Sequence, residues 1–199
     1  MIPRNVVIPA VLLLALATGM SLYLWQLRRR EASSARPARV AAQHVIPPVS
    51  GPTEKVTVFV VYDTPGELRT QSISIPLFSD RQRRAEELLR GLLNIYAEKN
   101  SPHPLAPGAE VREVYLVSPD LAVIDVSSAL VDGHTSGILA EELTVVSLIQ
   151  TLTRNIPGIM RVKILADGKE RETLAGHADL SSFYDVSQVS QVAQQLAQH

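Results

Sequence analysis

The sequence predicts an α/β (α+β) fold: a two-layer sandwich in which two main helices cover one face of a mixed sheet, preceded by one transmembrane helix. Three observations lead to this prediction. The predicted elements follow one another as strand pair, helix, strand pair, helix and strand, which is a loose internal repeat. Both helical segments carry a single apolar stripe, as expected of helices that cover a sheet. A run of twenty uncharged residues near the N-terminus has the length of a membrane-spanning helix.

The predicted strands are short runs rich in β-branched and aliphatic residues. The first begins at Val56, and a Pro65-Gly66 turn joins it to a second strand through Ile73 and Ile75, with which it should pair. Proline fixes φ at the first central position of such a turn, and glycine accepts a positive φ at the second. The remaining strands are expected at Val111 to Val117, at Leu121 to Ser127 and at Met160 to Ala166.

Two amphipathic helices are predicted from apolar residues that recur every three or four positions. Ser79 and Gln82 have the spacing of a capping box and should begin the first helix. Its apolar stripe comprises Ala85, Leu88, Leu89, Leu92, Leu93 and Tyr96. The stripe of the second helix comprises Leu139, Leu143, Val146, Ile149 and Leu152, and this helix should end at Asn155, Pro157 and Gly158.

The uncharged run from Val6 to Trp25 predicts an anchor in the lipid bilayer, because a helix of this length spans about 30 Å of hydrocarbon. Tyr23 and Trp25 suit the membrane interface, and Arg28 to Arg30 follow as a charged stop. The alternative is a cleaved secretory signal with Ala15-Leu16-Ala17 as its cleavage site. Cleavage there would leave an apolar stub before the arginines, so an uncleaved anchor is favoured.

The chain divides into four predicted regions: an N-terminal transmembrane anchor (1–30), a Pro- and Ala-rich linker (31–54), an α/β domain (55–182) and a Gln-rich C-terminal tail (183–199). Prolines scattered among small residues, with no apolar period, are typical of a flexible linker. The tail has Val186, Val189, Val192 and Leu196 at near-helical spacing. It is predicted to be either a short helix or disordered.

Composition and charge exclude several classes of function. The chain has no cysteine, which removes disulfides, thiolate metal ligands, a cysteine nucleophile and the lipid-acceptor cysteine of a bacterial lipoprotein. Residues 1–54 carry six Arg against two Glu, whereas residues 55–199 carry thirteen basic against eighteen acidic side chains. Because phosphates need a basic face, we expect no nucleic-acid partner for this acidic globular part.

Several stretches between residues 56 and 182, taken in order, resemble the GerMN domain family of spore-germination and sporulation proteins, here in a single copy. They are Val56 to Tyr62, Ala85 to Leu93, Val123 to Ser128, Gly137 with Glu141-Glu142, Thr151 to Thr153 with Pro157-Gly158, Val162 to Gly168, and Gly176 to Ser181. The resemblance implies a small, membrane-tethered α/β domain on the extracytoplasmic side of a bacterial envelope. It implies no catalytic residues and a likeness to ring-building modules.

Five residues are candidates for contact with a partner: Asp125, Ser127, Ser128, His177 and Asp179. Asp125 and the two serines lie at the end of a predicted strand, where a ligand contact competes with capping of the following turn by the Asp125 carboxylate. His177 and Asp179 could supply half of a metal site, but two ligands from one loop do not complete one, so a structural turn is favoured.

Other polar residues receive structural interpretations. His134, near Asp132 and Ser136, is assigned to a surface loop because no serine lies in a Gly-x-Ser-x-Gly motif. His103 is likewise assigned to a loop, with His44 in the linker and His199 in the tail. Glu141-Glu142 are placed in the first turn of a helix, where carboxylates suit the helix dipole. The sequence therefore predicts no catalytic residue, no cofactor and no bound metal.

The leading functional hypothesis is a non-enzymatic cell-envelope module that binds an envelope protein or the peptidoglycan cell wall. One alternative is a cell-wall hydrolase or metal-dependent enzyme, which requires a pocket that joins Asp125, His177 and Asp179. The other is a ring-building element that self-associates as a homo-oligomer. The expected location is the cell membrane, single-pass, with the domain outside, although the arginines after the anchor favour the cytoplasm by the positive-inside rule.

Overall fold

The computed structural model describes residues 51–196. The predicted anchor and nearly all of the predicted linker lie outside these residues. Among the helices of the described part, none is both long and apolar enough to cross a membrane. The single-pass anchor at Val6 to Trp25 thus stays a prediction.

The first two strands form a separate antiparallel hairpin. Strand β1 (Thr53–Tyr62) pairs with β2 (Glu67–Pro76), and Val56 lies opposite Ile73, which confirms the predicted pairing. Gly66 in the connecting turn has a φ of +98°, the conformation that favours glycine. Val56, Val58 and Val60 are buried, so one face of the hairpin belongs to the core.

The second sheet has four strands in the order β3, β4, β5 and β6. Strand β3 (Val111–Ser118) runs antiparallel to β4 (Leu121–Val126), and β4 runs parallel to β5 (Arg161–Ala166). The long connection that a parallel pair requires contains the second main helix. A two-residue strand, β6 (Tyr184–Asp185), pairs antiparallel with β5.

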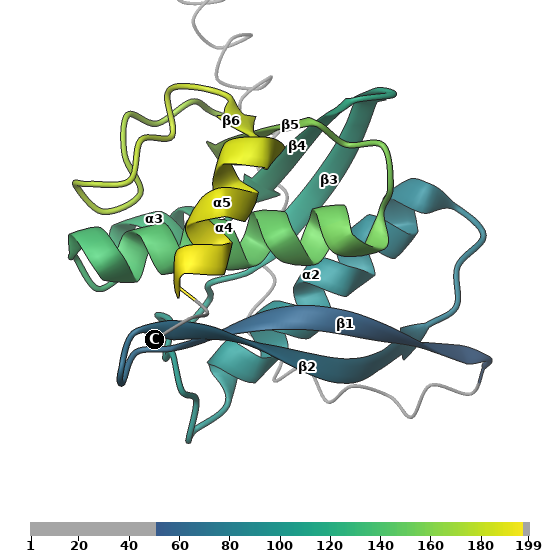
Figure 1. Cartoon of the computed structure of the whole chain (residues 1–199), viewed down its shortest axis with the longest axis horizontal. Helices are drawn as coiled ribbons and strands as arrows, with labels where there is room; N and C mark the ends of the chain where they lie inside the picture. Colours follow the sequence, from purple (N-terminus) through teal and green to yellow (C-terminus); the bar gives the residue numbers. More distant parts are fainter. Residues whose placement is uncertain (1–50, 197–199) are drawn as a thin grey trace, which may run out of the picture. The chain divides into compact units, whose positions relative to one another are not determined.

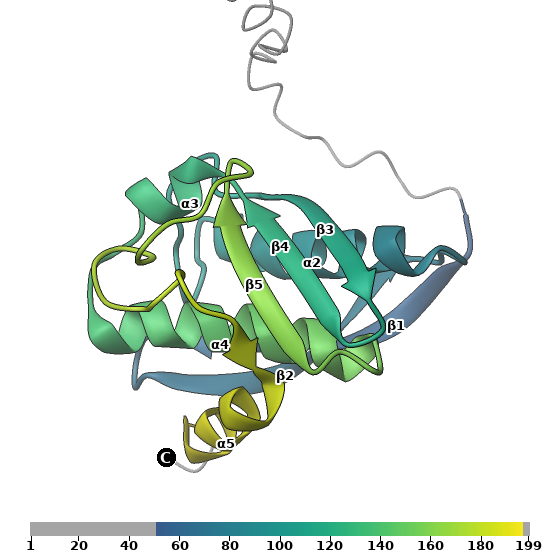
Figure 2. The ribbon, with the colours of Figure 1, turned by 90° about the horizontal axis from the view of Figure 1, so that it is seen from above.

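Within residues 51–196, four helices accompany the sheets: α2 (Arg81–Ala97), α3 (Ser128–Asp132), α4 (Ile138–Asn155) and α5 (Val186–Leu196). Helices α2 and α4 lie between the β1–β2 hairpin and the four-stranded sheet (Figure 1 and Figure 2). All six residues of the predicted stripe on α2 are buried. The mixed α/β class is confirmed, with helices that face a sheet on either side.

The single mixed sheet of the prediction is wrong, because β1 pairs with no strand of the second sheet. The outer edge of β1 instead forms hydrogen bonds with side chains of α4. Thr151 Oγ1 accepts from the Phe59 N–H at 2.9 Å, and Ser147 Oγ donates to the Phe59 carbonyl at 2.6 Å. One turn further along, Asn155 Nδ2 donates to the Thr57 carbonyl at 2.7 Å. A polar row on a helix thus occupies the edge that another strand would need.

Three local predictions also change. Helix α2 has Asp80 as its N-cap, whose carboxylate accepts from the Arg83 N–H at 2.7 Å, so the Ser79–Gln82 capping box does not form. The predicted loop around Asp132 contains the short helix α3. Residues 184–196, predicted as a helical or disordered tail, form β6 and α5, and α5 buries Val189 and Ala193.

Candidate functional site

A groove lies between α4, α5 and the segment that joins β5 to α5, with a cavity of about 520 Å³. Its floor is aliphatic, with Val145 and Val146 from α4 facing Val189 and Val192 from α5. Phe183, 55% exposed, stands at its border. The other lining residues are Ile138, Glu142, His177, Ala178, Asp179, Ser182, Tyr184, Asp185 and Gln188. An apolar floor with a few polar groups at the rim is typical of a binding site.

The buried carboxylate of Glu141 positions the wall that carries His177. Its Oε2 accepts the backbone N–H groups of Ala175, His177 and Ala178 at 2.8–3.0 Å. Its Oε1 accepts the Gly137 N–H at 3.1 Å and the His177 Nδ1–H at 2.8 Å. Five N–H groups therefore converge on one side chain with no solvent exposure. The loop and the His177 ring are held in place by α4.

The pKa of Glu141 reflects this environment. Burial alone would raise it, but the hydrogen bonds from the His177 ring and from the backbone N–H groups of Ala178, Ala175 and His177 outweigh burial. The pKa is held well below its ordinary value. Glu141 is thus an anion at neutral pH and holds the loop as a carboxylate.

The rim of the groove is acidic. Hydrogen bonds from Ser181 and Ser182 lower the pKa of Asp179, and hydrogen bonds from Ser187 and the Gln188 backbone lower that of Asp185. Both carboxylates lie on the groove together with Glu142. The rim therefore stays negatively charged down to acidic pH and favours a cationic group on a ligand.

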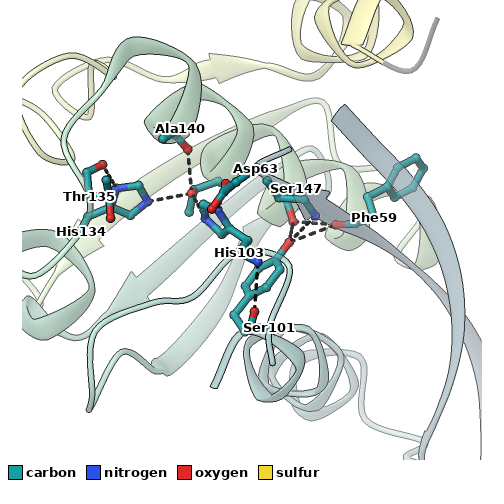
Figure 3. Close-up of polar contacts among 11 residues, drawn as sticks. Phe59, Asp63, Ser101, His103, His134, Thr135, Ala140 and Ser147 are labelled. Atoms are coloured by element: carbon teal, nitrogen blue, oxygen red, sulfur yellow. Dashed lines mark hydrogen bonds and ion pairs between the residues drawn. The ribbon is translucent and has the colours of Figure 1, made fainter. Parts of the chain in front are cut away.

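A second polar cluster lies beside the opposite side of α4, around a smaller cavity of about 300 Å³ (Figure 3). His103 Nδ1 lies 2.6 Å from Asp63 Oδ1, and its Nε2 lies 2.7 Å from Thr144 Oγ1. The same hydroxyl lies 2.8 Å from His134 Nε2, and His134 Nδ1 lies 2.7 Å from the Thr135 carbonyl. Desolvation lowers the pKa of His134.

Tyr96 connects this cluster to the hairpin. Its ring meets that of His103 edge to face at 5.0 Å, and its hydroxyl accepts from the Val61 N–H at 2.9 Å. The same hydroxyl lies 2.7 Å from Ser147 Oγ. Burial raises the pKa of Tyr96 to about 12. The phenol is thus a neutral member of the hydrogen-bonded core.

The structure separates the five candidate residues into two places. His177 and Asp179 both lie on the groove. Asp125 does not, because its buried carboxylate accepts from the Gly168 N–H at 2.7 Å, in the turn after β5. The sequence suggested that Asp125 caps the turn directly after β4, whereas in the structure it caps the turn after β5.

Ser127 and Ser128 also make contacts within the domain. Ser127 Oγ donates to the Gly108 carbonyl at 2.8 Å and accepts from the Glu110 N–H at 3.0 Å. Hydrogen bonding by Ser128, together with the charge of Arg112, lowers the pKa of Asp167. These three residues thus fasten the loops at one end of the sheet, and the groove is assembled elsewhere.

Three important side chains received other assignments from the sequence. His103 and His134, assigned to loops, are 2% and 8% exposed and lie in the polar cluster. Glu141, assigned to helix-dipole stabilisation, organises the groove wall. The sequence did contain a signal for the contact between Glu141 and this loop. Glu141 and the stretch from Gly176 to Ser181 both belong to the segments that resemble the GerMN family. Among the described residues no three His, Cys, Asp or Glu side chains are grouped to hold a metal ion.

Residues 52–172 match the model of the Germane family, described as "Sporulation and spore germination". The chain belongs to the Germane family. This confirms the GerMN resemblance, with one copy of the domain. No protein with a curated function matches the sequence.

Three solved structures are similar to this Germane chain. A protein described as a lipoprotein of Clostridium perfringens has a TM-score of 0.44 and 19% identity, over 69% of this chain and 89% of that one. The tandem GerMN domains of the sporulation protein GerM from Bacillus subtilis have a TM-score of 0.48 and 19% identity, over 66% and 45%. The first GerMN domain of that protein has a TM-score of 0.43 and 18% identity, over 65% and 94%.

Proposed function

We propose that this Germane domain is a non-enzymatic binding module of the cell envelope, tethered by the Val6 to Trp25 segment, and that the α4–α5 groove receives its partner. The observation that carries the proposal is the Glu141 anchor. Five hydrogen bonds fix the groove wall before any ligand arrives, so binding has little ordering entropy to overcome.

The chemistry of the groove indicates the kind of partner. The valines of α4 and α5 suit an aliphatic or aromatic side chain, and the rim carboxylates of Glu142, Asp179 and Asp185 suit a neighbouring cation. A protein segment with an apolar residue beside Lys or Arg has both features. The family description and the apolar N-terminal run support a partner in the envelope, outside the cytoplasm.

Site-specific crosslinking in intact cells tests this proposal. Phe183 is replaced by p-benzoylphenylalanine, which places a photoreactive ring at the groove border, and Tyr115 on β3 receives the same replacement as the control. We expect a discrete crosslinked partner from position 183 but not from 115, with a lower yield when Asp179→Asn and Asp185→Asn are added. Equal products from both positions, or none from 183, would refute the groove as the binding site.

A hydrolase is the second candidate, because the Glu141 carboxylate orients the His177 ring at the groove, and a histidine oriented in this way can act as a general base. Asp125, the third residue of that hypothesis, caps a turn away from the groove. The two functions are separated by incubating the full chain with purified peptidoglycan. The binding proposal predicts that the parent chain releases no more soluble fragments than the His177→Ala variant does. Fragment release by the parent chain that the His177→Ala substitution abolishes would establish the hydrolase.

A further inference from the structure

One end of the domain gathers basic side chains from three elements that are far apart in the sequence. Arg84 of α2 donates to the Glu54 carboxylate at 2.6 Å and 2.8 Å, and to the Asn155 carbonyl at 2.6 Å. Arg81 donates to the Pro157 carbonyl at 2.7 Å. The start of β1, the start of α2 and the end of α4 therefore meet, on the right-hand side of Figure 1. The basic side chains of this end, called the basic end below, are Lys55, Arg81, Arg83, Arg84 and Arg154.

The carboxylates at this end are engaged in contacts of their own. Glu54 pairs with Arg84, and Asp120, in the turn between β3 and β4, pairs with Arg161 at 3.2 Å. Asp80 is the N-cap of α2. These carboxylates are fewer than the cations around them, so the basic end has an excess of positive charge. Because the globular part as a whole is acidic, the charge of the domain is polarised towards this end.

Three of the cations, Lys55, Arg83 and Arg154, are exposed and form no ion pair with any described residue. Contacts within the domain account for Arg81 and Arg84, which bond to carbonyls after and at the end of α4. They do not account for Arg83, which lies in the first turn of α2, where the helix dipole disfavours a cation and no acidic residue offsets it. Exposed cations kept at an unfavourable position indicate a partner outside the domain.

The chain also enters the domain at the basic end. The described residues begin at Gly51, and the Leu77 N–H donates to the Pro52 carbonyl at 2.9 Å. The Leu77 side chain is 53% exposed, and a large apolar side chain among cations suits the headgroup region of a bilayer. We propose that the basic end docks on the anionic phospholipid headgroups of the bilayer that holds the Val6 to Trp25 segment. This inference rests on the tether of the proposed function but not on the groove.

Docking by the basic end keeps the α4–α5 groove away from the lipid. Helix α4 contributes Arg154 to the basic end, whereas its first half lines the groove, and Glu142 lies about 18 Å from Arg154 along the helix axis. That distance is longer than the range of about 8–10 Å over which physiological salt screens charges. The anionic surface also repels the acidic rim of Glu142 and Asp179. The groove therefore remains accessible to a partner in the envelope.

Quenching of a fluorescent label by spin-labelled lipid tests the proposal. Because the chain has no cysteine, Ser79→Cys gives a single labelling site at the basic end, and Ser136→Cys gives one before the opposite end of α4. Both serines are exposed. The labelled full chain is reconstituted into phosphatidylcholine vesicles that carry a headgroup nitroxide, with or without phosphatidylglycerol. We expect strong quenching at position 79 only when phosphatidylglycerol is present, and little quenching at position 136 in either lipid.

The matched variants remove cations that form no ion pair with a described residue. Lys55→Gln, Arg83→Gln and Arg154→Gln together should lower the quenching at position 79 to the level at position 136. Lys99→Gln with Lys169→Gln, which lie elsewhere on the surface, should leave it as in the parent.

Three results would overturn the docking surface: equal quenching at positions 79 and 136, quenching at 79 that does not depend on phosphatidylglycerol, or quenching that the three substitutions leave unchanged. Flotation of the vesicles in alkaline carbonate reports separately on the tether. Loss of the chain from the floated vesicles would refute the tether, and the quenching measured before the alkaline step still decides the docking.

Discussion

The hydroxyl of Thr151 accepts the backbone N–H of Phe59 at 2.9 Å, so a helix completes the hydrogen bonding of a strand edge. Thr151→Val preserves the shape of the side chain but leaves this N–H without a partner. We expect a loss of about 1–3 kcal/mol in the free energy of unfolding, measured by urea denaturation of the full chain.

Thr153→Val is the control for that measurement. Thr153 lies on the same helix, but its hydroxyl donates to the Ile149 carbonyl of its own α4. We expect its effect to be within about 0.5 kcal/mol of the parent. Equal losses of unfolding free energy in Thr151→Val and Thr153→Val would show that the hydrogen bond to β1 adds no more stability than a hydrogen bond within α4.

Glu141→Gln should release the loop that carries His177. The amide cannot accept all five N–H groups as the carboxylate does, so we expect a loss of about 3 kcal/mol or more. Glu142→Gln, at the groove rim, should leave the stability nearly unchanged. Hydrogen exchange of the 175–178 amides measures the local effect, and unchanged protection in Glu141→Gln would disprove the anchor.

The same anchor predicts a pH dependence. Because the folded-state pKa of Glu141 is lowered, its stabilisation is complete above the unfolded value of about 4.3 and is lost only as pH falls through the lower folded value. The difference in unfolding free energy between the parent and Glu141→Gln should therefore persist at about pH 4. A difference that already vanishes between about pH 6 and pH 5 would contradict the prediction.

Two tyrosines should titrate late in alkali. Burial raises the pKa values of Tyr96 and Tyr184 to about 12, whereas an ordinary tyrosine ionises near 10. The native state therefore keeps protons that the unfolded chain loses, and stability should fall as pH rises from about 10 to 12. Phenolate absorbance of the parent, compared with Tyr96→Phe, measures the delayed fraction. In Tyr96→Phe, we expect the absorbance change that appears late in the titration to be smaller by the contribution of one tyrosine.

Asp125 and Asp179 should separate stability from binding. Asp125→Ala removes the buried carboxylate that accepts the Gly168 N–H, and a hydrogen bond to a charged group contributes more than a neutral one, so we expect a loss of about 1–3 kcal/mol. Asp179→Ala, on the exposed rim, should change stability little and lower the crosslinking yield at position 183. Unfolding and crosslinking of the same two proteins give both quantities, and a reversed pattern would place the partner at Asp125.

Elements with a regular apolar period could be predicted from the sequence. The stripe on α2 is buried at all six positions, because a period of three and four fixes one face of a helix regardless of its neighbours. The hairpin was equally predictable, since a turn and two β-branched runs are adjacent in the chain.

The division into two sheets could not be predicted in this way. Ser147, Thr151 and Asn155 look like ordinary polar residues on a helix, and only the packed structure shows that they meet Phe59 and Thr57. His103 and His134 gave no local signal either, since Thr144 joins them from positions 41 and 10 residues away. Contacts of this kind depend on the assembled helices and loops, which no short pattern encodes.

The polar row on α4 also affects how copies of the domain meet one another. A strand with an open edge is a template for other chains, and proteins held together on one surface encounter each other often. By satisfying the β1 edge with hydroxyl and amide groups, α4 denies that edge to a neighbouring chain. Among the described strands, β2 in the hairpin and β3, which ends the four-stranded sheet and exposes Val117, each have a strand on one side only. Any β-mediated stacking of this domain would then have to use an edge other than that of β1.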